Sequence, residues 1–205
     1  MFGNLNSLFA NYMYQYKILF LFIMLLLSAC ASGPTNKKTA ASPASDFSKV
    51  RVSSTVQNQF NQAIDLLKQG KYEPAINLLK EVVSREKKLP APFINLAIAY
   101  HKTEKLDPAV ESLKSALELD PGNAVANNEL GLIYRKQGKF QQAREAYEKA
   151  IISNPTYLPA IRNLGVLCDI YLQDYRCAYE QFETYLKYEE DETVKIWLAD
   201  VKRRL

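Results

Sequence analysis

Small and apolar residues recur at a spacing of 34 along residues 56–188. Each copy of the pattern has a small residue in its first half, an apolar residue three positions later and, in three of the copies, a second small residue further on. The three sets are Ala63, Ala97, Gly131 and Gly165; Leu66, Tyr100, Tyr134 and Cys168; and Ala75, Ala109 and Ala143. A repeat of this length predicts units that stack and bury one another's apolar faces.

The third copy carries the fullest motif, with Leu130-Gly131, Tyr134, Ala143, Tyr147 and Pro155. This motif resembles the tetratricopeptide repeat, whose signature is Leu-Gly-x-x-Tyr, then Ala-x-x-x-Phe, then Pro. The resemblance implies an all-α, right-handed solenoid in which every unit is two antiparallel helices. We place about four such helix-turn-helix units within residues 54–188, at 56–89, 90–123, 124–157 and 158–188.

The fourth copy is longer than the others. Tyr175 and Phe182 follow their counterparts by 35 residues, which indicates one extra residue near Leu172-Gln173-Asp174. We expect this residue in the turn between the two helices of the unit, because an insertion disturbs a turn least.

Residues 189–205 predict a C-terminal capping helix. Asp191 suits the N-cap, and Val194, Trp197, Leu198 and Val201 follow at i, i+3, i+4 and i+7. This apolar face would cover the last repeat while the polar face meets water. We expect Trp197 to pack in the core, with an anchor for a partner as the alternative.

The N-terminal residues 1–29 have the pattern of a signal peptide. The apolar run Ile18–Leu27 has ten residues, whereas a membrane span needs about 20. Met13 is an alternative start that gives a more ordinary basic segment before that run. Leu27, Ser28, Ala29 and Cys30 resemble the lipobox of bacterial lipoproteins, in which the signal is cleaved before Cys30 and the cysteine is acylated. An ordinary secretory signal with an accidental cysteine is the alternative.

Residues 30–53 read as the lipidated N-terminus and a flexible tether, since they are rich in Ala, Ser, Thr and Pro. Ala31 follows the cysteine. By resemblance to enterobacterial sorting, which retains lipoproteins with Asp at that place in the inner membrane, we expect a lipid anchor on the periplasmic face of the outer membrane.

Composition argues against catalysis and against nucleic acid. The chain has one His, three Cys and a formal net charge of +4, with both signs interspersed. Nucleic-acid binders concentrate basic residues on one face, which this pattern does not do. No Cys-x-x-Cys pair, Gly-rich phosphate loop or nucleophile elbow is present in the sequence. We therefore expect no enzyme activity, no cofactor and no metal site.

Cys168 and Cys177 are the two cysteines left once Cys30 is lipidated. In an oxidising compartment an even pair favours a disulfide, while two small buried apolar residues are the alternative.

The resemblance also places an inner, partner-binding face on the first helix of each unit. The expected binding residues are Phe60, Ile64 and Lys68; Ile94, Ile98, His101 and Lys102; Asn128, Leu132, Arg135 and Lys136; and Arg162 and Val166. Ile64, Ile98, Leu132 and Val166 form an apolar stripe spaced by 34, and Lys68, Lys102 and Lys136 form a cationic row beside it.

A lipobox, a short tether and repeats together resemble the pilotin lipoproteins that bring the secretin of type IV pili to the outer membrane. We therefore predict a periplasmic scaffold that binds a protein or peptide partner in envelope assembly. An adaptor for peptidoglycan hydrolases, or a structural subunit of an envelope complex, is the alternative.

Overall fold

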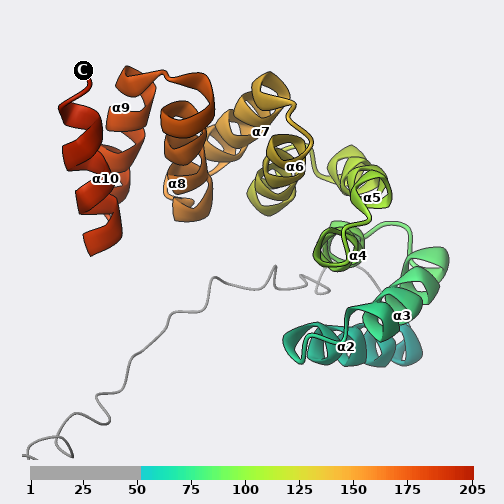
Figure 1. Ribbon diagram of the computed structural model, residues 1–205. Coiled ribbons are helices and arrows are strands. Elements are labelled where there is room, and N and C mark those ends of the chain that lie inside the picture. Colours follow the sequence, from blue (N-terminus) through green and yellow to red (C-terminus); the bar gives the residue numbers. More distant parts are fainter. Residues whose placement is uncertain (1–51) are drawn as a thin grey trace, which may run out of the picture. The chain divides into compact units, whose positions relative to one another are not determined.

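Each of the four expected units folds as two helices joined by a short turn. The computed structural model describes residues 52–205, and within that range every regular element is helical (Figure 1). The helices are α2 (Ser54–Lys68), α3 (Tyr72–Arg85), α4 (Pro90–Lys102), α5 (Leu106–Leu119), α6 (Ala124–Lys136), α7 (Phe140–Ser153), α8 (Leu158–Val166), η2 (Leu167–Leu172), α9 (Tyr175–Leu186) and α10 (Glu192–Lys202). Each helix packs against the next along the chain, so the predicted all-α repeat fold with a capping helix is confirmed. None of the helices in the described range is long and apolar enough to cross a membrane.

The turns between paired helices share one backbone conformation. The residue at the turn has positive φ in all four units, namely Gly70 (73°), Glu104 (61°), Gly138 (74°) and Gln173 (52°). In the third unit, the Lys139 N–H then donates to the Tyr134 carbonyl at 2.9 Å, and the first two units have the same bond. A left-handed residue at this place reverses the chain while satisfying carbonyls at the helix end. Glycine adopts this conformation without cost, which explains its use in two of the turns.

The extra residue of the fourth unit does not lie in the turn as expected. Helix α8 instead continues into the π-helix η2, Leu167–Leu172, and the turn after it keeps its left-handed residue, Gln173. The closing bond now runs from the Asp174 N–H to the Cys168 carbonyl, one residue further back than in the other units. A π-helix accommodates one added residue within a helix. The insertion therefore widens the helix, and the turn after it keeps the conformation of the other units.

In the third and fourth units the small residue of the first helix is glycine, and an aromatic ring from the second helix of the unit packs against it. A methyl group added to Gly131 would lie 2.5 Å from the Tyr147 ring, and one added to Gly165 would lie 2.5 Å from the Phe182 ring. The first two units have Ala63 and Ala97 at the small position and leucines, Leu79 and Leu113, where the rings stand. All of these side chains are buried, so each unit fills the same space in one of two ways.

The capping helix α10 closes the last unit as predicted. The Asp191 carboxylate accepts from the N–H groups of Thr193 and Val194, at 2.8 and 3.2 Å. Val194 is fully buried, and the Trp197 ring lies 5.6 Å from that of Phe182. Trp197 is therefore packed against the core, as the sequence predicts.

Candidate partner-binding surface

The first helices of neighbouring units touch one another, α2 with α4, α4 with α6, and α6 with α8. Their solvent-facing sides therefore form one continuous area, which we call the first-helix surface. The apolar stripe lies on it: Ile64, Ile98, Leu132 and Val166 are all half-buried. Side chains of this kind have apolar area left for a partner.

Three of the expected binding residues lie in the interior instead. Phe60 is 2% exposed and Ile94 is 1% exposed, and both belong to the apolar core. Asn128 is also buried, and its amide oxygen accepts from Asn163 Nδ2 at 2.9 Å, joining α6 to α8. These three residues stabilise the stack. They are buried because Phe60 and Ile94 pack in the apolar core and Asn128 bonds to the neighbouring helix α8, whereas Arg162, at the matching position of the fourth unit, is exposed.

The cationic row is largely neutralised by the protein's own carboxylates. Lys136 pairs with Glu104 of the preceding unit, and Lys68 lies 3.4 Å from Asp65. Lys102 is exposed and has no ion pair among residues 52–205. The row is therefore not a uniform binding feature, because sequence spacing does not reveal which carboxylates lie beside each lysine.

Two polar side chains of the surface interact with residues of a neighbouring unit. His101 Nδ1 lies 3.8 Å from the Glu129 carboxylate, which joins the second and third units. The Arg135 guanidinium stands 5.9 Å from the centre of the Tyr171 ring, which η2 contributes from the fourth unit. A cation over an aromatic face is attracted by the ring quadrupole. Arg162 is exposed at the far end of the surface.

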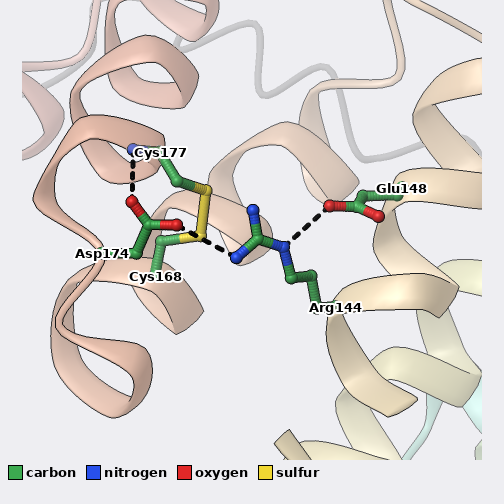
Figure 2. A network of polar contacts seen from close by, with 5 residues as sticks. All are labelled: Arg144, Glu148, Cys168, Asp174 and Cys177. Atoms are coloured by element: carbon green, nitrogen blue, oxygen red, sulfur yellow. Dashed lines mark hydrogen bonds and ion pairs between the residues drawn. A yellow bond between two sulfur atoms is a disulfide. The ribbon is translucent and has the colours of Figure 1, made fainter. Parts of the chain in front are cut away.

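A network of polar contacts joins the third and fourth units (Figure 2). The Arg144 side chain lies between two carboxylates, with Nε 2.9 Å from Glu148 and Nη1 3.0 Å from Asp174. Asp174 caps α9 by accepting from the Cys177 N–H at 3.1 Å. That hydrogen bond, and beyond it the Arg144 contact, holds the pKa of Asp174 below its ordinary value.

Cys168 and Cys177 form a disulfide beside this network, with a Cα separation of 5.9 Å. Both residues are buried, so the bond ties η2 to the start of α9 from within the core. The two sulfurs and an Asp174 oxygen lie within 4.8 Å of one another, which is metal-ligand spacing. However, the sulfurs are bonded to each other, and the Asp174 carboxylate accepts from Cys177 and Arg144, so these atoms are already engaged.

A surface pocket of about 310 Å³ lies between α5, α6 and α7. Four of its polar side chains contact one another in pairs: Lys114 lies 2.8 Å from Glu111, and Gln137 donates to Asp107 at 3.2 Å.

The residues predicted for lipidation and signal cleavage, Cys30 with Leu27, Ser28 and Ala29, lie outside the described residues. The sequence analysis did not predict that Tyr171 of η2 is exposed beside Arg135, or that the Tyr147 hydroxyl is buried without a hydrogen-bond partner in residues 52–205. The 35-residue spacing of the fourth unit was the available signal for Tyr171. The small residue Gly131, against which the ring packs, was the signal for Tyr147.

Comparison with known proteins agrees with this architecture. A tetratricopeptide-repeat model matches residues 124–157, and a TPR repeat model matches residues 99–138. A crystal structure of MamA is 26% identical, with a TM-score of 0.59 over 64% of this chain and 77% of that chain. PilF of Pseudomonas aeruginosa is 20% identical, with a TM-score of 0.66 over 73% of this chain and 68% of that chain. MamA of Desulfovibrio magneticus RS-1 is 22% identical, with a TM-score of 0.65 over 74% and 86%.

No curated protein matches the sequence significantly. The family models identify tetratricopeptide repeats within residues 99–157, and the similar folds agree with a helical solenoid of about four units and a capping helix in the described part of the chain.

Proposed function

We propose that this protein is a non-catalytic scaffold of the bacterial envelope that binds a protein partner on the first-helix surface. The observation that carries the proposal is the stripe of half-buried apolar residues, one per unit, on helices that touch. Such a stripe suits the apolar side chains of an extended or helical partner segment. Repeat stacks use their extended surfaces in this way.

Lipid attachment at Cys30 would place the scaffold on the periplasmic face of the outer membrane. Two features support a location outside the cytoplasm: the lipobox Leu27-Ser28-Ala29-Cys30 and the disulfide between Cys168 and Cys177. Disulfides persist in oxidising compartments such as the periplasm and are rare in the cytosol.

Within the envelope we propose a pilotin-like function, in which the protein helps a secretin or a type IV pilus to assemble. The order of lipobox, tether and repeats supports this, since it is the order in the pilotin lipoproteins that the chain resembles. The fold similarity to PilF of Pseudomonas aeruginosa is compatible with it.

Capture of the partner by crosslinking tests the proposal. The lipidated protein should be crosslinked in cells, purified and analysed by mass spectrometry, and a secretin subunit is the expected partner. Ile98→Asp with Leu132→Asp should abolish capture, because charges would replace the apolar contacts. Ile152→Asp is the matched control, because Ile152 is 79% exposed on the second helix α7.

Recovery of peptidoglycan hydrolases instead would favour the adaptor function. Equal capture by the double variant and the control would show that the first-helix surface is not the binding site.

A further inference from the structure

The outer face of the capping helix α10 is partly apolar, although the sequence predicts a polar one. Helix α10 lies at the end of the stack, where it packs against α9, and its outer face is open to solvent (Figure 1). Ile196 on this face is 67% exposed, Tyr188 just before the helix is 56% exposed, and Leu205 just after it is 62% exposed. Single exposed apolar residues are ordinary, whereas several at one end of a molecule indicate a surface that another molecule covers.

Four exposed residues of α10 form one stripe along the helix, which we call the α10 stripe. Glu192, Ile196, Ala199 and Arg203 follow one another by four, three and four positions, and all four are exposed. Residues at these intervals lie on one face of a helix and have the spacing of a coiled-coil seam. Along the helix the α10 stripe is therefore acidic, then large and apolar, then small, then basic.

This order makes the α10 stripe complementary to its own reverse. When a second α10 lies antiparallel, with a two-fold axis midway between Ile196 and Ala199, Glu192 of each copy faces Arg203 of the other. Ile196 of each copy then faces the small side chain of Ala199. A two-fold contact between identical chains requires this self-complementarity. A parallel second copy would instead place Glu192 on Glu192 and Arg203 on Arg203, which like-charge repulsion opposes.

The ion pairs within one chain do not prevent this exchange. Glu192 lies 2.8 Å from Lys195, and Arg203 lies 2.8 Å from Asp200. Exposed pairs of this kind contribute little, so replacing them by pairs between two copies costs little. Lys195 and Asp200 stand equally far from the two-fold axis, and they face each other across it as a second reciprocal pair.

We propose that the α10 stripe joins two copies of this chain into an antiparallel, two-fold dimer. This inference goes beyond the scaffold function and does not depend on it. The same arrangement brings the end of α10 near Tyr188 towards Leu205 of the second copy, which adds apolar area at both ends of the contact. Stable interfaces bury about 1,200 Å² or more, and two helices of 11 residues cover less, so we expect a dimer that forms reversibly.

Crosslinking of introduced cysteines tests the register of the two helices. Glu192→Cys and Arg203→Cys are made in the full chain, produced singly or together in the same cells, and treated with a short bismaleimide. We expect a crosslinked dimer only when both variants are present, because each position faces the other and not itself. The unsubstituted chain is the control for the native cysteines, of which Cys168 and Cys177 are bonded.

A dimer in either variant alone, or no dimer in the mixture, would overturn the proposed pairing. Crosslinking to a different protein in place of a second copy would show that a heterologous partner covers α10, and would overturn it too.

Charge reversal tests the self-complementarity on the purified full chain, with association measured by sedimentation. Glu192→Arg alone and Arg203→Glu alone should each weaken the dimer by about 10-fold, because both pairs across the axis become like-charged. A mixture of the two variants should associate as well as the unsubstituted chain, because each copy then meets the opposite charge. Unchanged association of the single variants, or no recovery in the mixture, would overturn the antiparallel pairing.

Ile196→Asp should abolish the dimer in both experiments, because it places a charge at the centre of the contact. Ile152→Asp is the matched control, since Ile152 is 79% exposed on α7 and lies outside the α10 stripe. Both positions are exposed, so the thermal midpoint of the folded chain should stay the same in the two variants. Equal dimer formation by Ile196→Asp and Ile152→Asp would show that the α10 stripe is not the interface.

Discussion

At the scale of single residues, the pairing of glycine with an aromatic ring determines how the last two units pack. Gly131→Ala and Gly165→Ala should each be destabilising, because the new methyl group would stand 2.5 Å from the ring of Tyr147 or Phe182. Overpacking of this kind costs about 1 to 3 kcal/mol. Urea unfolding monitored by circular dichroism measures the loss.

The paired substitution provides a control. Gly131→Ala with Tyr147→Leu recreates the combination found in the first two units, Ala63 with Leu79 and Ala97 with Leu113, and should recover part of the lost stability. An unchanged midpoint in Gly131→Ala would show that the ring can move aside and that the small residue is not required.

Much of this packing could be predicted from sequence, and part could not. The 34-residue spacing identified the small residues and their aromatic neighbours, because repeated units give repeated environments. The family resemblance placed Phe60, Ile94 and Asn128 on the binding surface, although the structure buries them. The spacing also predicted a cationic row that includes Lys136, although Glu104 pairs with that lysine. Ion pairs and burial depend on contacts between units, which a linear pattern does not contain.

The stability that Asp174 contributes to the junction of the third and fourth units should depend on pH. Hydrogen bonding from the Cys177 N–H, with help from Arg144, lowers the pKa of Asp174 in the folded state. Its contribution is therefore complete above the ordinary aspartate pKa of about 4 and disappears as the pH falls below that value. Asp174→Asn should cost about 1 kcal/mol or less at pH 7, the size of an exposed ion pair, and nothing at strongly acid pH.

Thermal unfolding of both proteins between pH 7 and pH 2 tests this. Glu180→Gln, an exposed change on the same helix α9, should leave the pH profile unchanged. A constant difference between Asp174→Asn and the parent at all pH values would mean that the charge of Asp174 does not contribute.

At the scale of elements, the disulfide compensates for the irregular fourth unit. The extra residue makes η2 wider than an α-helix, and Cys168–Cys177 ties this segment to α9 across nine positions. Closing a loop of this length contributes about 2 to 3 kcal/mol in the chain-entropy model. Cys168→Ala with Cys177→Ala should lose that stability, and its unfolding midpoint should be insensitive to a reducing agent.

The redox state of the two cysteines in the cell can be measured directly. Protein taken from the periplasm, unfolded without reduction, should not react with an alkylating reagent at either cysteine. Full alkylation of both thiols would show that the bond does not form in the cell.

At the scale of the whole molecule, the capping helix and the disulfide define how the solenoid ends. Val194 and Trp197 of α10 cover the last repeat. Arg204 Nη2 lies 2.8 Å from an Asp169 carboxylate oxygen on η2, which also holds the C-terminus against this repeat. Trp197→Ala should therefore cost up to about 3 kcal/mol, the low end for large core deletions because Trp197 is only half-buried, and expose the Phe182 ring. Because neighbouring units stabilise one another, the loss should lower the stability of the third unit as well as the fourth. Hydrogen exchange resolved by unit measures this spread, and protection lost in α10 alone would contradict it.

The last prediction concerns attachment to the membrane through Cys30. Each buried methylene of an acyl chain contributes about 0.8 kcal/mol, and two or more chains give stable anchoring where one gives reversible binding. Cys30→Ala should block both acylation and cleavage before residue 30, so the variant should take up no labelled palmitate and should disappear from the outer-membrane fraction. Ala31→Asp is the matched control: it should keep acylation and, under the enterobacterial sorting rule, move the protein to the inner membrane. The thermal midpoint of the repeat domain should be the same in both variants, since the substitutions lie outside residues 52–205. Normal labelling and normal fractionation of Cys30→Ala would show that Cys30 is not the anchor.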